Sequence, residues 1–133
     1  MKVFYSPEMV ADAQSFSPSA RKPREVMGSW QRRFPLIEVI PVLPVTVEEL
    51  CLAHDPDHVR GVLSLRRANG FGNHLAQVAA SLPWTSGAML GAARAALVDG
   101  CAVAPVAGFH HACFADGGGY CTFNGLMVAA LVL

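Results

Sequence analysis

A run of helix-forming residues followed directly by an apolar run is the feature that most constrains how this chain can fold. Residues 84–100, WTSGAMLGAARAALVDG, offer Thr85 and Ser86 as N-caps and continue with strong helix formers. Gly100 then suits a helix C-terminus, and residues 101–109, CAVAPVAGF, are apolar at every position. Such a run is typical of a strand buried on both faces of a parallel sheet. A helix followed by this strand predicts an α/β layer architecture.

The N-terminal part of the chain predicts strands and helices in the same alternation. Residues 1–5, MKVFY, are rich in strand-forming side chains, and residues 24–34 place apolar side chains at helical spacing. Residues 36–46 are apolar and β-branched but contain two prolines, each of which removes a hydrogen-bond donor from a sheet. We therefore expect a short strand there, at the edge of the sheet.

Further helices are expected in the middle and at the end of the chain. Asp55 can cap a helix, Pro56 suits its first position, and Asp57 lies at the positive end of its dipole. Residues 46–54 predict a helical turn. Residues 123–133, FNGLMVAALVL, favour a helix entering the core, and this apolar helix stops without a boundary. Truncation of a longer chain explains that ending.

Length, composition and charge limit the classes of function open to this chain. Its 133 residues, 53% of them hydrophobic, suffice for one core and are too few for two ordinary domains. Ten Lys and Arg balance ten Asp and Glu, so no basic surface for nucleic acid or an anionic membrane is expected. The apolar runs are far shorter than the roughly 20 residues of a membrane span, and no secretory signal is evident. We therefore predict a single cytoplasmic domain.

Three of the five histidines have structural interpretations. His54 and His58 are four residues apart, the spacing at which two ligands share one helix face in zinc sites. The helix start at Asp55 accounts for the acidic residues between them, which favours a structural role over metal binding. His74 lies in a loop rich in glycine and asparagine and is expected at the surface.

His110 and His111 follow the predicted strand 101–109 directly. Ligands of open α/β sheets bind beyond the carboxyl ends of the strands, which is where this pair is expected. Two adjacent side chains reach one cavity only if the backbone bends, and Gly108 permits that bend. The three glycines at 117–119 permit close backbone approach or positive φ, although they lack the GxGxxG spacing of a nucleotide site. A tight turn with two satisfied histidines is the alternative.

Residues 108–124, GFHHACFADGGGYCTFN, resemble the signature of the histone deacetylase and acetylpolyamine amidohydrolase superfamily. In that signature a glycine, an aromatic residue and two histidines precede a short loop and then a glycine, an aromatic residue, a cysteine and an asparagine. The upstream pieces SFSPSARKPREV, AHDPDHV and NGFGNHLAQVAASLPWTSGAMLGAARAAL are similar to the N-terminal part of bacterial members. The resemblance implies that residues 1–133 form the N-terminal portion of a three-layer α/β/α arginase/deacetylase-like fold with a mostly parallel sheet.

The resemblance also implies an activity, the zinc-dependent hydrolysis of an acetylated amine such as acetyl-lysine or an acetylpolyamine. By carry-over, His110 stabilises developing charge, and His111 acts as general base and then as general acid for the leaving amine. The tunnel that holds the substrate would be lined by Phe109, Gly119 and Tyr120. Four other positions would border the site, namely Gly108, Cys121, Asn124 and Arg24.

The residues that hold zinc in that family, an aspartate and a histidine in a DxH motif and a further aspartate, lie beyond the dyad in sequence and are absent here, as is a downstream tyrosine. A catalytic zinc needs three protein ligands, so we expect Zn²⁺ only in a complete family domain and no activity from this chain alone. Two alternatives remain open. One is a non-catalytic fragment that associates with itself through an exposed sheet edge, and the other is a ureohydrolase related to arginase.

Overall fold

A parallel sheet of three short strands forms the base of the fold in this computed structural model, which describes all of residues 1–133. The central strand is β1 (Lys2–Phe4), with β2 (Glu38–Ile40) on one side and β3 (Ala102–Val103) on the other. Val3 of β1 lies opposite both Val39 and Val103, and its side chain is fully buried. The prediction of a short edge strand within residues 36–46 is confirmed.

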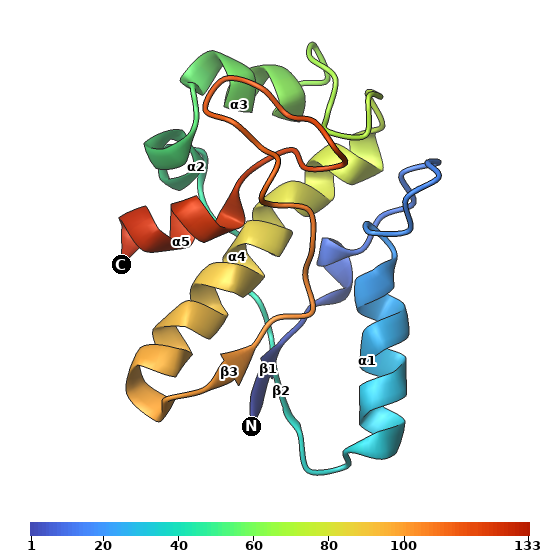
Figure 1. The fold of residues 1–133 in the computed structure, drawn as a ribbon, viewed down its shortest axis with the longest axis vertical. Helices are drawn as coiled ribbons and strands as arrows, with labels where there is room; N and C mark the ends of the chain where they lie inside the picture. The colour runs from blue at the N-terminus through green and yellow to red at the C-terminus, as the bar shows by residue number, and fades with distance from the viewer.

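The remaining elements are helices, several of which begin where local sequence signals place them. They are the 3-10 turn η1 (Pro7–Met9) and the α-helices α1 (Lys22–Arg33), α2 (Val47–Ala53), α3 (Pro56–Leu63), α4 (Ala76–Asp99) and α5 (Gly125–Val132). The Thr46 hydroxyl caps α2, and the Asp55 carboxylate caps α3 by accepting from the amides of Asp57 and His58. In the view of Figure 1 the strands lie between α4 and α1, as expected for an α/β layer fold. None of the helices is both long and apolar enough to cross a membrane.

The long helix α4 begins at Ala76, nine residues before the N-caps expected from the sequence. Thr85 and Ser86 therefore lie inside the helix, where the Thr85 hydroxyl donates to the Leu82 carbonyl at 2.9 Å and Ser86 is buried. Pro83 lies in the helix interior, and its carbonyl accepts a hydrogen bond from Val45 N–H at 3.1 Å. The expected start was wrong because burial of Val78 and neighbouring side chains keeps the first turns helical despite the proline.

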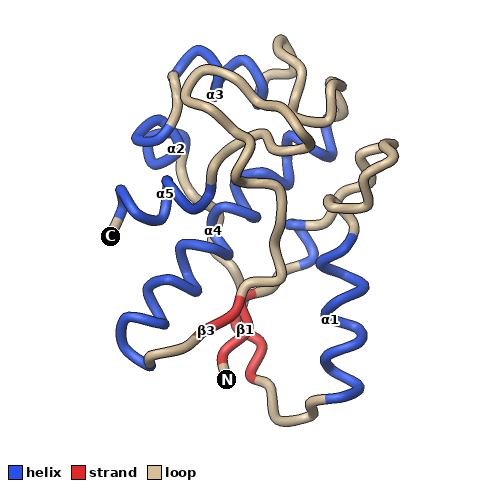
Figure 2. Tube along the Cα trace, in the orientation of Figure 1, coloured by secondary structure: helices blue, strands red, loops and turns tan.

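Strand β3 is much shorter and less buried than the run 101–109 predicts. Only Ala102 and Val103 pair with β1, and both are half-buried at the sheet edge rather than enclosed on two faces. Pro105 has no N–H to continue the ladder. The chain therefore leaves the sheet after two residues, and Figure 2 shows the long loop that follows it up to α5.

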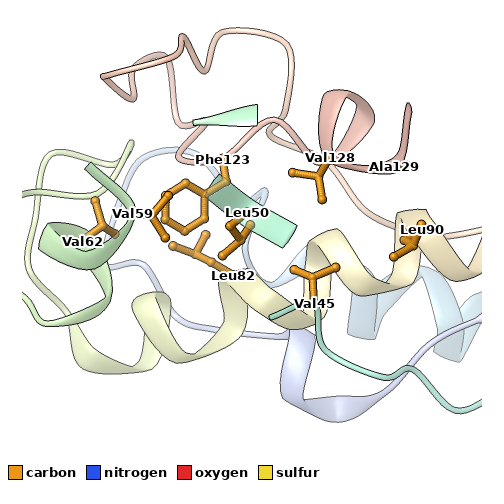
Figure 3. Packing of buried hydrophobic residues seen from close by; sticks show 9 residues of the cluster. All are labelled: Val45, Leu50, Val59, Val62, Leu82, Leu90, Phe123, Val128 and Ala129. Atoms are coloured by element: carbon orange, nitrogen blue, oxygen red, sulfur yellow. The ribbon is translucent and has the colours of Figure 1, made fainter. Parts of the chain in front are cut away.

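The main hydrophobic core lies where α2, α3, α4 and α5 meet, away from the small sheet. Phe123, which is only 2% exposed, lies between Val59 and Leu50 in Figure 3. The cluster consists of Val45, Leu50, Val59, Val62, Leu82, Leu90, Phe123, Val128 and Ala129. Phe123 lies just before Asn124, the N-cap of α5, at the end of the loop that carries the two adjacent histidines. Its packing in the core therefore fixes that end of the loop.

Candidate functional site

The two adjacent histidines occupy the centre of a tight turn on the carboxyl side of β3. Ala112 N–H donates to the Phe109 carbonyl at 3.2 Å and closes this turn. Both histidine side chains are exposed, whereas Phe109 and Ala112 on either side are buried. The ring centroids of His110 and His111 are 4.0 Å apart, with the ring planes at 44°. The bend that brings them together begins at Gly108, whose φ is +85°.

Gly119 lies directly against His111. Its φ is +54°, and a Cβ atom added there would be 2.9 Å from Cγ and Cδ2 of the His111 ring. Of the three consecutive glycines, this is the one with positive φ, and a Cβ at Gly118 would meet no atom within 4 Å. Gly119 is thus the glycine that needs to lack a side chain for the imidazole to lie where it does.

A second turn, made by residues 118–121, presents Tyr120 beside the histidine turn. Cys121 N–H donates to the Gly118 carbonyl at 2.9 Å, and Gly118 N–H donates back to the Cys121 carbonyl at 2.9 Å. Tyr120 has a left-handed φ of +66°, and its half-exposed ring is 5.9 Å from that of Phe71. The turn brings Gly119 to His111 while it places Tyr120 next to the loop before α4.

The loop of residues 69–74 is hydrogen-bonded to this turn and to the residue that follows it. The Gly70 carbonyl accepts from Tyr120 N–H at 3.0 Å, and Gly70 N–H donates to the Thr122 hydroxyl at 2.9 Å. A Cβ at Gly70 would collide with the backbone of Cys121. Gly70 and Thr122 therefore belong to the site's framework, although the sequence gives no sign of their contact because they are 52 residues apart.

A small cavity of about 30 Å³ lies behind the turn, with space for about two water molecules. Three of the residues expected at the site, Gly108, Phe109 and Tyr120, are among those that line it. The Phe109 ring also packs closely on Gly125, since a Cβ there would be 2.8 Å from the ring. The tunnel role of Phe109, Gly119 and Tyr120 stays a prediction, but the structure brings all three to one place.

The residues expected at the border have separate positions. Cys121 is buried, and its thiol donates to the Gly119 carbonyl at 3.5 Å. Asn124 caps α5, because its side-chain oxygen accepts from Met127 N–H at 3.2 Å. Arg24 is exposed in the first turn of α1, and its neighbour Pro23 lines the small cavity instead. Arg24 therefore does not border that cavity here, and its expected role stays untested.

His54 connects the two ends of the segment that carries the second turn. Its Nδ1 lies 2.9 Å from the Cys113 carbonyl oxygen and 3.3 Å from that of Phe114, while Asn124 N–H donates to Nε2 at 2.7 Å. The side chain is 1% exposed. Burial lowers the pKa of His54 below its usual 6.5, the two carbonyl contacts oppose that effect, and the nearby His58 adds to it.

His58 is the second buried histidine and packs beside the first. Its Nε2 lies 3.3 Å from the Thr122 carbonyl oxygen, and its Nδ1 has no hydrogen-bond partner. The helix start at Asp55 is confirmed, yet both histidines also support the loop. Sequence reasoning missed this function because the partners of His54 are 59 and 70 residues away. His74 is exposed, as expected, and its Nδ1 lies 2.9 Å from the Leu65 carbonyl oxygen.

The residues of this chain do not form a zinc site by themselves. No three His, Cys, Asp or Glu side chains are grouped so that they could hold a metal ion. A catalytic zinc needs three protein ligands and one open position. In addition, Nε2 of His54 already accepts a backbone hydrogen bond and is not free to bind a metal.

The parallel sheet, the long covering helix and the histidine turn beyond β3 define a class of fold, and comparison with solved structures shows which one. The HD domain of HDA15 superimposes with a TM-score of 0.79 at 22% sequence identity, and the match covers 98% of this chain and 42% of that one. The present chain thus spans less than half the length of the chain that it matches. A search of curated proteins finds no match.

The sequence itself places the chain in a family. The sequence model of the histone deacetylase domain family matches residues 19–133, which is most of the chain. The chain belongs to the histone deacetylase family, and the matching region includes all five histidines. This confirms the resemblance seen in residues 108–124 and the partial α/β fold expected from it. It also leaves the ureohydrolase alternative without a supporting observation.

Proposed function

We propose that this chain carries the proton-transfer and tunnel-lining part of a deacetylase site that acts on an acetylated amine of the acetyl-lysine or acetylpolyamine type. The observation that carries the proposal is the convergence of His110 and His111, whose ring centroids are 4.0 Å apart beside Gly119 and Tyr120. Membership of the histone deacetylase family supplies the reaction class.

The chemistry suits two neighbouring imidazoles on an exposed turn. Imidazole exchanges protons near neutral pH, so His111 can take a proton from an attacking water and deliver it to the leaving amine. His110, when protonated, can stabilise the negative charge that develops on the carbonyl oxygen. Tyr120 offers a ring with a polar edge as a wall for an extended acyl-amine chain.

The proposal includes a requirement for residues outside this chain. A complete domain of the family would use Zn²⁺, and the three ligands for that ion would have to come from elsewhere. The 133 residues alone are therefore expected neither to bind zinc tightly nor to hydrolyse substrate. Calorimetric zinc titration and an acetyl-lysine peptide assay on the purified chain test this, and a stoichiometric tight site or turnover would contradict it.

The role of the dyad is tested by joining this chain in one polypeptide to the complementary C-terminal part of a deacetylase domain. Zinc-dependent turnover is expected, with a loss of about 100-fold or more in His111→Ala. Gln31→Ala is the control, because Gln31 is exposed near the C-terminal end of α1 and lies outside the site. A folded, zinc-loaded fusion in which His111→Ala keeps full turnover would refute the role.

A second candidate function is self-association without catalysis. Strands β2 and β3 are both open edges, and α5 exposes about half of the side chains of Leu126, Met127 and Leu131 (49%, 48% and 51%). Light scattering coupled to size-exclusion chromatography distinguishes the two functions. A monomer at high protein concentration removes the support for self-association and leaves the deacetylase proposal intact.

A further inference from the structure

The hydrogen bonds of His54 define its protonation state. A backbone carbonyl only accepts and a backbone N–H only donates, so Nδ1 must carry a proton toward Cys113 and Nε2 must present a lone pair to Asn124. Only the neutral Nδ1–H tautomer satisfies both contacts. The doubly protonated ring would direct an Nε2–H at the Asn124 N–H, where the two donors repel each other.

The two contacts connect the ends of one functional segment. Residues 113–124 begin directly after the histidine turn, include Gly119 and Tyr120, and end at the N-cap of α5. Asp55 N–H also donates to the Phe114 carbonyl at 2.9 Å, so the entry to the segment is held by two consecutive residues. At the exit, the contact from Asn124 N–H to the His54 ring acts together with the buried Phe123 and with the contacts of Thr122 to Gly70 and His58.

We propose that His54 is a positioning residue that, as the neutral Nδ1–H tautomer, holds residues 113–124 against the dyad, and that its protonation releases the segment at Asn124. The contacts of the His54 ring are with Cys113, Phe114, Asn124, His58 and Phe123, so it acts through the segment that places Gly119 against His111. The effect of His54 on catalysis by His110 and His111 rests on the proposed function, whereas the release of the segment does not.

The surroundings of the ring support this behaviour. Helix α5 has no titratable group. The titratable groups of the other elements around the ring are Glu48, Glu49 and Cys51 of α2, Asp57, His58 and Arg60 of α3, Asp55 before α3, and Cys113, Asp116, Tyr120 and Cys121 of the segment. The Asp55 carboxylate is turned toward α3, where it accepts from two amides. The His58 ring, centred 5.9 Å away, opposes a charge on His54. Among the charged groups in these elements, only His58 affects the pKa of His54, and no carboxylate stabilises the protonated ring.

The direction of the pH dependence follows from linkage. The folded chain holds His54 neutral with a pKa lowered by burial, whereas the unfolded chain protonates it near pH 6.5. The unfolded state then binds more protons as the pH falls below 6.5. The stabilisation from this histidine is complete above that value and is lost as the pH falls through the lowered pKa.

The first test uses the unaltered chain. Nitrogen NMR of histidine-labelled protein at pH 7.5 should show protonated Nδ1 and bare Nε2 for His54. Hydrogen exchange should then show that the protection factor of the Asn124 amide falls by about fivefold to tenfold as His54 titrates, as expected for the loss of one net hydrogen bond. The amide of Gln31, in helix α1 outside the segment, is the internal reference for hydrogen exchange.

The second test separates the two contacts by substitution. His54→Gln places an amide oxygen near the position of Nε2, so it should keep the Asn124 amide protected and remove the pH dependence. His54→Asn places an amide nitrogen near the position of Nδ1, so it should keep the entry contact and lose the protection of Asn124 at every pH. Gln31→Ala, an exposed substitution near the C-terminal end of α1, should change neither quantity.

Two results would overturn the proposal. One is an Nε2–H tautomer of His54 at neutral pH, and the other is protection of Asn124 that stays constant through the titration. Both are measured on the wild-type chain, so they decide the matter even if a variant does not fold. Neither measurement involves turnover, so an inactive fusion protein would refute the proposed function without affecting the role of His54.

Discussion

Replacement of Gly119 by alanine should disturb the dyad in a predictable way. The added Cβ would be 2.9 Å from Cγ and Cδ2 of His111. Carbon atoms in ordinary contact are about 3.5 Å or more apart, so the ring has to move by at least about 0.6 Å. The ring is exposed and can move at small cost, but a shift of this size would misalign the proton transfer that we propose for His111. Misplacement by about 1 Å can reduce an enzymatic rate by about 100-fold.

The same substitution should also lower stability, because alanine disfavours the φ of +54° at this position. A left-handed conformation costs a residue with a Cβ roughly 1–2 kcal/mol. For a chain of 133 residues this corresponds to a fall in melting temperature of about 3–7 °C. Calorimetry measures this change, and the histidine ring signals in NMR report the displacement of His111.

Gly118→Ala is the matched control for this prediction. It adds the same methyl group one residue earlier, at a position without positive φ and with no atom within 4 Å of the new Cβ. Its melting temperature should change by less than about 2 °C, and the His111 signals should stay in place. If Gly119→Ala were as harmless as Gly118→Ala in both measurements, the argument from close packing and positive φ would be refuted.

Two further predictions concern the support of the loop. Phe123→Ala should reduce the free energy of unfolding by about 3–5 kcal/mol in denaturant titration, because this ring is 2% exposed in the main core; a loss below about 1 kcal/mol would show that the core does not depend on it. Asp55→Ala should cost about 1 kcal/mol, since its carboxylate accepts from two amides at the start of α3. Exposed Asp12→Ala removes a single loop contact, from Gln14 N–H, and should cost less; equal effects would argue against the cap.

Parts of the fold that depend on neighbouring residues could be predicted from the sequence. Asp55 and Pro56 define the start of α3 through contacts within one turn of the chain. Two prolines confine β2 to the edge of the sheet for the same kind of local reason. The convergence of His110 and His111 was expected from Gly108, and its φ of +85° provides the bend.

Features that depend on distant segments could not be predicted. The first turns of α4 are helical despite Pro83 because Val78 and its neighbours are buried against other parts of the chain. Strand β3 ends early because Pro105 interrupts a ladder that the apolar pattern alone would extend. The contact of Gly70 with the turn at 118–121 and the bridge formed by His54 join residues more than 50 positions apart.

The histidine turn has a thermodynamic consequence that follows from its flanks. Phe109 and Ala112 are 7% and 8% exposed, so two buried residues flank the two exposed histidines. The backbone of His110 and His111 therefore loses its conformational freedom when the chain folds. Under the proposed function, an arriving substrate would meet a histidine backbone that is already ordered, and its binding energy would not have to compensate for the entropy of ordering that backbone.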